Sequence, residues 1–197
     1  SDRAFLISQG HLKGINLTMN ISECSGNIFS AIQSIVEIDQ LTAKGYGSSN
    51  ESLISVNQSN AIFRNMDLSN SENDAIESDQ SIIYIDNLSA YNNKGDGIDA
   101  FRTNLTVKNS TIKDNECQGI ALHNFSNLKF DSSIISSNKG ISIYASRNSF
   151  FDLRGASKIT SATKEAIKQQ VKKGVATKAI RKEILNSPED LANLASK

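Results

Sequence analysis

The sequence predicts a mainly β solenoid, in which successive coils of the chain stack on one another, followed by a helical C-terminal segment. Three observations support this fold class. An apolar marker residue returns at an almost constant interval, each interval contains three short runs of alternating apolar and polar residues, and an asparagine recurs between two of those runs. A repeat of about 20 to 50 residues is typical of stacked structural units.

The interval is clearest in the centre of the chain. Counted in both directions from Ile98, the equivalent apolar positions are Ile54, Ile76, Ile120 and Ile141, with steps of 22, 22, 22 and 21 residues. Within a run, strict alternation places one side of a short strand in the core and the other in water. Each coil of about 22 residues is therefore expected to contain three strands, and the chain about seven coils.

Further positions recur within each coil. The inward residues of the second and third strands are predicted to be Ala61, Phe63, Leu68, Ile83, Ile85, Ala90, Leu105, Val107, Ile112 and Ile134. Asn65, Asn87 and Asn109 each follow the marker by eleven residues, where a sharp bend needs a residue that tolerates a left-handed backbone. Stacked coils would align these three side chains in an asparagine ladder.

The N-terminal coils match the pattern less closely. Residues 1–26 are interpreted as the first coil, with Ile7 as marker and Ile15, Leu17 and Ile21 pointing inward. The second coil begins near Phe29, and its segment 34–43 aligns with 81–90. Residues 44–49 are expected to form a lengthened turn. Coils three to six occupy about 51–139, and an incomplete seventh begins at Gly140.

The spacing becomes helical near Ser161. Ile167, Val171 and Val175 recur every four residues, and Ser187-Pro188 is typical of a helix start. We therefore divide the chain into a solenoid at 1–157 and a helical segment at 158–197. Because an open solenoid end exposes core and unpaired backbone, this segment is interpreted as a cap, or as a docking segment that makes a homo-oligomer.

Charge is distributed unevenly, although the formal net charge is zero. Residues 1–157 contain 12 Lys/Arg and 17 Asp/Glu, whereas 158–197 contain 9 and 4. The basic residues are not interleaved with aromatic ones, which argues against nucleic-acid binding. No run approaches the length of a membrane span and no signal pattern begins the chain, so we expect a soluble chain that is mature or cut from a longer one.

Two cysteines occur, Cys24 and Cys117. The repeat places them four coils apart, about 19 Å at the usual strand spacing, which exceeds disulfide reach. Two unpaired thiols are therefore predicted. A cell-surface, secreted or virion location is favoured, and the free thiols leave a cytoplasmic one open.

The first strand of each coil presents polar side chains outward. If the marker points inward, one outward column contains Glu77, Asp99, Ala121 and Ser142, and the next contains Asp79, Phe101, His123 and Tyr144. Asp74 and Asp96 precede these strands at the turn. Glu77 and Asp99 would then lie about 5 Å apart, a separation that suits a retaining glycosidase. Their repulsion would raise one pKa, as a general acid requires.

Flat rings beside acids also suit sugar binding, with Phe101 and Tyr144 as the apolar faces. The alternative is that all of these residues form the solvated outer side of a polar sheet. In water the repulsion between neighbouring charges is then small enough for the fold to tolerate. No His/Cys cluster with metal spacing is present, so no metal site is predicted.

The Gly-Ile coil starts and the turn asparagines resemble the right-handed parallel β-helix, or pectin-lyase-like, family over about residues 5–155. The resemblance implies that the outward first-strand face is where related polysaccharide lyases and hydrolases place their active sites. Gly95-Asp96-Gly97-Ile98-Asp99 looks like the Thr-Asp-Gly segment of polygalacturonases. The next coils carry Cys117-Gln118 and Lys139-Gly140 where that family has paired aspartates and Gly-His-Gly. Related lyases use calcium-binding acids with a basic residue, for which Arg102 is the nearby candidate.

We therefore expect a non-catalytic β-helix module of a larger surface, virion or filament-associated protein, similar to an adhesin or tailspike, that binds polysaccharide or a protein partner. Ligand-binding candidates are Asp74, Asp79, Phe101, Arg102, His123 and Tyr144. The alternative is a polysaccharide lyase or glycoside hydrolase that uses Glu77, Asp96 and Asp99. No cofactor is expected, except calcium under the lyase alternative.

Overall fold

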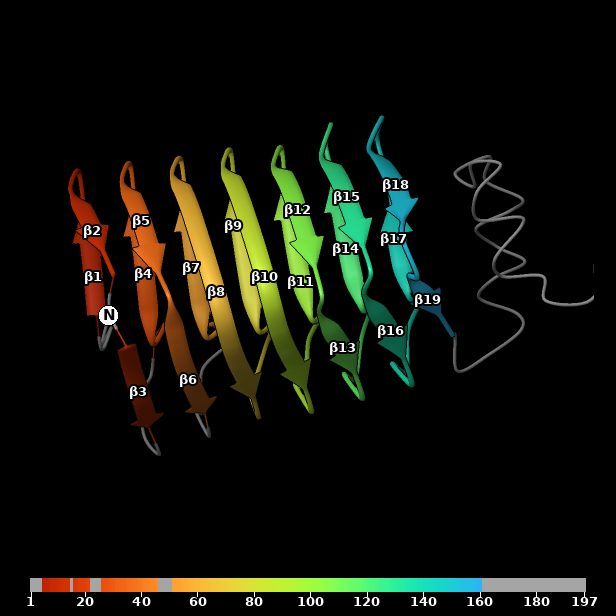
Figure 1. Cartoon of the computed structure of the whole chain (residues 1–197), viewed down its shortest axis with the longest axis horizontal. Coiled ribbons are helices and arrows are strands. Elements are labelled where there is room, and N and C mark those ends of the chain that lie inside the picture. The colour runs from red at the N-terminus through yellow and green to blue at the C-terminus, as the bar shows by residue number, and fades with distance from the viewer. Residues whose placement is uncertain (1–4, 15, 22–25, 46–50, 161–197) are drawn as a thin grey trace, which may run out of the picture.

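The computed structural model describes residues 5–14, 16–21, 26–45 and 51–160, and every statement below concerns these ranges. Their strands are all parallel and form two sheets, and the coils stack along the long axis of the molecule (Figure 1). No helix occurs in these ranges. The predicted mainly β, parallel solenoid is confirmed.

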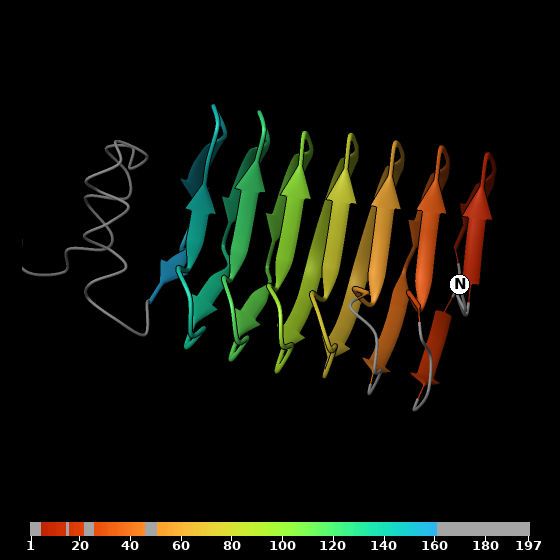
Figure 2. The same ribbon diagram turned by 180° about the vertical axis from the view of Figure 1, so that it is seen from behind.

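One sheet contains the first strand of each coil and faces the viewer in Figure 2. Its seven strands, in spatial order, are β1 (Phe5–Ser8), β4 (Phe29–Ile32), β7 (Ile54–Asn57), β9 (Ile76–Asp79), β11 (Ile98–Phe101), β14 (Ile120–His123) and β17 (Ile143–Ala145). We call this the first-strand sheet. Because its order follows the chain, side chains one coil apart in sequence are neighbours across it.

The other sheet contains twelve strands and bends around the remaining sides of each coil. Its strands are β2 (His11–Lys13), β3 (Asn16–Ile21), β5 (Ile35–Ile38), β6 (Gln40–Gly45), β8 (Asn60–Ser69), β10 (Ile82–Tyr91), β12 (Asn104–Lys108), β13 (Thr111–Lys113), β15 (Asn127–Asp131), β16 (Ile134–Ser136), β18 (Phe150–Arg154) and β19 (Lys158–Ile159). In the third and fourth coils a single long strand, β8 or β10, runs through the second turn.

The predicted marker column is correct through the central coils. Ile54, Ile76, Ile98 and Ile120 pair in register across the first-strand sheet, and all four are fully buried. Stacking identical branched side chains at the strand spacing fills the core continuously, which stabilises each coil through its two neighbours.

The column departs from prediction after Ile120, because the first turn of that coil contains one extra residue. Asn124 and Phe125 both adopt a left-handed backbone, with φ of 52° and 71°, where the coil before has Arg102 alone. Every later position shifts accordingly. Ile143, not Ile141, pairs with Ile120; likewise Ile135 occupies the inward position predicted for Ile134, which is 40% exposed.

The marker position of the first coil lies two residues earlier than predicted. Phe5 pairs with Phe29, and their rings stack with centroids 5.5 Å apart. Ile7, predicted as the marker, is instead aligned with Ala31. Leu17 packs against the core as expected. Phenylalanines occupy the marker position in the first two coils, so the spacing of isoleucines does not locate the first coil.

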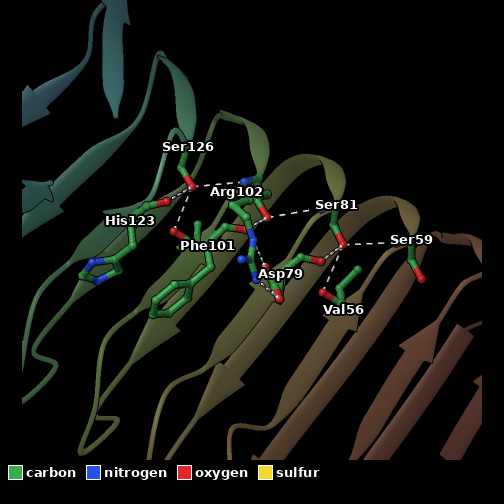
Figure 3. A network of polar contacts seen from close by, with 10 residues as sticks. Val56, Ser59, Asp79, Ser81, Phe101, Arg102, His123 and Ser126 are labelled. Carbon is green, nitrogen blue, oxygen red and sulfur yellow. Dashed lines mark hydrogen bonds and ion pairs between the residues drawn. The ribbon is translucent and has the colours of Figure 1, made fainter. Parts of the chain in front are cut away.

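Buried hydroxyl groups connect the coils at the first turn. Gln58, Gln80 and Arg102 adopt a left-handed backbone, and each is followed by a buried Ser or Thr. In the example drawn in Figure 3, Ser81 Oγ donates to Asp79 O at 2.8 Å and accepts from Ser59 N at 3.1 Å. The same pattern continues through Thr103 and Ser126, so at each of these turns a buried hydroxyl accepts the backbone N–H of the preceding coil.

An asparagine ladder forms at the third turn. Asn93, Asn115 and Asn138 are almost fully buried. Asn93 Nδ2 donates to Asn115 Oδ1 at 2.8 Å, and Asn115 Nδ2 donates to Asn138 Oδ1 at 2.9 Å. The same oxygens accept the backbone N–H of the preceding coil. This ladder satisfies both ends of each amide and sets the coil register.

The predicted ladder lies at the second turn and is only partly formed. Asn65, Asn87 and Asn109 have the left-handed backbone expected of them, with φ of 55°, 63° and 50°. Asn87 Nδ2 donates to Asn65 Oδ1 at 2.7 Å, but Asn109 donates to Asp86 instead. These side chains are exposed, so water competes for their hydrogen bonds and the amides need not stack.

Charges alternate in sign along one outward column of the twelve-stranded sheet. The strand register aligns Arg64, Asp86, Lys108, Asp131 and Arg154. Parallel stacking in register would otherwise place like charges opposite one another, which is destabilising. If a strand paired with the next coil but one, like charges would lie opposite each other, so the alternation favours the observed order of coils.

The solenoid extends to Ile159, two residues beyond the expected boundary at 157, because β19 pairs with β16. The predicted helices, the turn residues 46–49, Ile15 and Cys24 lie outside the described residues. Cys117 is a free, exposed thiol.

We expect Asn115→Ala to lower the free energy of unfolding by about 3 kcal/mol, because it leaves buried amide and backbone N–H groups of neighbouring coils without partners. Urea denaturation measures this. Asn104→Ala is the matched control: Asn104 is exposed and bonds Asn127, so the change should stay within about 0.5 kcal/mol. Equal losses in the two variants would contradict a stabilising role for the buried ladder.

Candidate functional site

The first-strand sheet brings two acids together on its outward side. Glu77 of β9 and Asp99 of β11 are direct register partners, as predicted. The alternation of the strands turns Ile76 and Ile98 into the core and these carboxylates outward. The next residue of this column is Ala121, followed by Tyr144.

That last position corrects the prediction, which put Ser142 in this column and Tyr144 in the next. The extra residue at Asn124–Phe125 moves β17 along the chain, so Tyr144 becomes the register partner of Ala121. Ser142 is buried, 3% exposed, and lies before the strand. The second column contains Asp79, Phe101 and His123, as predicted.

Three rings lie against one another across β11, β14 and β17. The Phe101 and His123 rings stack with centroids 4.6 Å apart and planes 19° apart. The Tyr144 ring follows at 5.5 Å from His123, tilted by 51°. His123 Nδ1 lies 3.1 Å from Ser146 Oγ, which holds the imidazole in place. We call Phe101, His123 and Tyr144 the ring row.

Asp99 lies beside this row in an unusual environment. Its Oδ1 is 3.4 Å from His123 Nε2, yet this enclosed oxygen accepts no hydrogen bond. Burial, and then the carboxylates of Asp74, Asp96 and Glu77, raise the pKa of Asp99 to about 7. Burial, and then the charge of Arg147, lower the pKa of His123. Near pH 7 the pair therefore consists of a partly protonated acid and a mostly neutral imidazole.

Asp74 and Asp96 occupy the turn before the sheet, and their side chains are bound to the backbone. Asp74 Oδ1 accepts from Asp96 N, and Asp96 Oδ1 accepts from Gln118 N, each at 2.6 Å. Both residues are 8% exposed. Burial raises the pKa of both, that of Asp96 to about 7. These two acids connect coils and add charge beside the site, rather than presenting a free carboxylate.

Arg102 is held by an ion pair at the first turn. Its guanidinium donates to Asp79 Oδ1 from Nε at 2.9 Å and to Asp79 Oδ2 from Nη2 at 2.6 Å (Figure 3). Figure 3 also shows Phe101 and His123 on the adjacent strands. A guanidinium neutralised in this way is a poor candidate for the basic residue of a lyase.

The repeat did not point to Ser52 or Ser146, which hold site residues in place. Ser52 Oγ donates to Asp74 Oδ2 at 3.2 Å. Ser52 occupies the position of Asp74 one coil earlier, and Ser146 that of His123 one coil later, so counting coils could have found both. Identifying their contacts needed the side-chain geometry.

Within the described ranges, no group of three or more His, Cys, Asp or Glu side chains is arranged to hold a metal ion. The same part of the chain has no helix long and apolar enough to cross a membrane.

The acids predict a stability that falls as pH rises. Asp96 and Asp99 have pKa values of about 7 in the folded state and about 4 when unfolded, so between these values the folded state binds more protons. Unfolding free energy should decrease across pH 4 to 7 by a few kcal/mol. His123 opposes this weakly, since its lowered pKa costs stability as pH falls below about 6.5.

Asp99→Asn should flatten this pH dependence, measured by thermal unfolding from pH 4.5 to 8. Asp114→Asn is an isosteric control, because Asp114 lies on the third turn beside Lys113, away from the first-strand sheet. A slope unchanged by Asp99→Asn would show that burial of this carboxyl does not cause the effect.

Comparison with known proteins gives one match. The family described as "Right handed beta helix region" matches residues 7–155. No curated protein matches the chain significantly, and no solved structure does.

Proposed function

Because the chain belongs to the right-handed β-helix family, whose repeating coils form an extended outward sheet, we propose that it is a glycan-binding module and that the first-strand sheet holds the ligand. The observation that carries this proposal is the ring row beside Asp99 and Glu77. Flat apolar rings next to hydrogen-bonding carboxylates are the combination that sugar rings and hydroxyls require. The wider context would be a surface, virion or filament-associated protein.

The strand spacing supports an extended polymer as the ligand. Phe101, His123 and Tyr144 come from three successive coils, so the ring row runs along the solenoid axis. A linear chain lying along that axis meets several rings at once, and each contact adds to affinity. A small molecule would meet one or two.

Phe101→Ala and Tyr144→Ala should each weaken glycan binding about tenfold, because each removes a stacking face worth about 1 kcal/mol or more. Calorimetry against a panel of soluble oligosaccharides measures this. Phe125→Ala is the matched control: Phe125 is 65% exposed and lies outside the ring row. Retained affinity in both ring-row variants would exclude this face as the binding site.

The alternative is a polysaccharide lyase or glycoside hydrolase. It is favoured by Asp99, whose pKa of about 7 keeps it partly protonated at neutral pH, as a general acid requires. Glu77 would be the second carboxylate. Asp96 is a weaker candidate than either, since Gln118 N already occupies one of its oxygens.

Release of reducing ends from polysaccharides separates the two functions. Binding without release, across neutral and charged substrates, supports a binding module. Release that Asp99→Asn abolishes, while Asp114→Asn leaves it unchanged, supports the enzyme instead.

Assembly through residues 158–197 is a further expectation, favoured by charge. This segment carries a formal charge of +5 against −5 for residues 1–157, so attraction between copies is possible. We expect truncation after Thr160, which spares β19, to reduce the mass measured by light scattering. An unchanged mass would exclude oligomerisation through this segment.

A further inference from the structure

The exposed apolar side chains of the described residues gather on one face of the solenoid. β5, the first halves of β8 and β10, and then β12, β15 and β18 pair into a continuous parallel sheet through coils two to seven. We call its outward side the second-strand face. Four of the seven large apolar side chains that the described ranges expose lie on this face, namely Ile35 (52%), Ile62 (36%), Ile82 (57%) and Phe150 (65%).

Three of these four side chains belong to one outward column that carries no charge. The strand register aligns, from coil two to coil seven, Ile35, Asn60, Ile82, Asn104, Asn127 and Phe150. A parallel sheet normally has both faces covered, and charged side chains are what usually keep an open protein surface from associating. An uncharged, partly apolar column on an open sheet therefore indicates an interaction surface.

Four residues further along each strand lies the column of alternating charge. Asp39 extends it to coil two, because its carboxylate is 2.7 Å from the guanidinium of Arg64. From coil two to coil seven the charged residues are Asp39, Arg64, Asp86, Lys108, Asp131 and Arg154. A series of six alternating charges is complementary to itself when it is reversed.

That reversal arises when a second copy lies face to face with the first and its solenoid axis runs the opposite way. Coil two then opposes coil seven, three opposes six, and four opposes five. Every charge of the column meets an opposite charge of the other copy, in the pairs Asp39 with Arg154, Arg64 with Asp131, and Asp86 with Lys108. With parallel axes, two facing sheets would instead place the charged column over the uncharged one, which buries charges without partners.

The remaining columns are compatible with the same arrangement. Ile35 of one copy would lie against Phe150 of the other, so the two apolar ends of the uncharged column would cover each other. In the middle column Glu37 would oppose Asp152, but each of these carboxylates already forms an ion pair within its own chain, with Arg64 and Arg154 respectively.

The size of the face sets the strength that such a contact can have. Six strands about 4.8 Å apart, with five residues of about 3.3 Å each, cover roughly 500 Å² per copy. The two copies together would bury about 1,000 Å², which is the low end for a specific interface. This area favours a reversible dimer with a dissociation constant in the micromolar range.

We propose that the second-strand face pairs two copies of this chain into a two-fold symmetric dimer with antiparallel solenoid axes. A two-fold interface uses the same surface of both copies, as the self-complementary column requires. The inference is independent of glycan binding, because the first-strand sheet lies on the other side of the solenoid (Figures 1 and 2). Both ring rows of the dimer stay open to solvent.

Sedimentation equilibrium of the full chain, from about 1 to 500 μM, tests the association. Wild type should pass from monomer to dimer, and Ile82→Asp should weaken dimerisation at least about tenfold, because it buries a charge near the two-fold axis. Ile134→Asp is the matched control, since Ile134 is 40% exposed but lies on β16, outside this face. A monomer at every concentration, or association that Ile82→Asp leaves unchanged, overturns the proposal.

Disulfide cross-linking tests the orientation, in chains that carry Cys24→Ser and Cys117→Ser. A mixture of an Ile35→Cys chain and a Phe150→Cys chain should cross-link on mild oxidation. Neither chain alone should do so, because the two copies of either position would be five coils, about 24 Å, apart. No cross-linking in the mixture, or equal cross-linking of either chain alone, overturns the antiparallel dimer.

Discussion

The structure depends on how each coil turns a corner without leaving buried backbone groups unpaired. At the first and third turns a left-handed residue is followed by a polar side chain that points inward and hydrogen-bonds across coils. Ser81 does this at the first turn and Asn115 at the third. Because each ladder residue bonds to the coils on either side, the coils must stack in one register. The apolar columns then supply the hydrophobic stabilisation that a single coil could not.

That register produces the candidate site as a consequence. Residues with no special relation in sequence become neighbours because they occupy the same position in successive coils. Glu77 and Asp99 are paired in this way, and so are Phe101 and His123. Parallel stacking brings like charges together, and the molecule counters this elsewhere by alternating sign, as in Arg64, Asp86 and Lys108. On the first-strand sheet it does not, because Glu77 and Asp99 are direct register partners.

The raised pKa values of Asp96 and Asp99 have a thermodynamic consequence. Burial beside other carboxylates makes ionisation of Asp96 and Asp99 unfavourable, so the face lowers the stability of the fold at neutral pH. A site that is destabilising when empty is common where function, rather than folding, selects the residues.

The sequence by itself determined the coil, its period of about 22 residues and which side of the central strands faces the core, because alternation and repetition are properties of local order. It also determined that Glu77 and Asp99 would be partners. Only the tertiary structure decided the rest. A single added residue at Phe125 moved Tyr144 into another column, and the contact of His123 with Asp99 arises from side-chain packing between coils. Burial of Asp96 likewise depends on neighbours that no local pattern specifies.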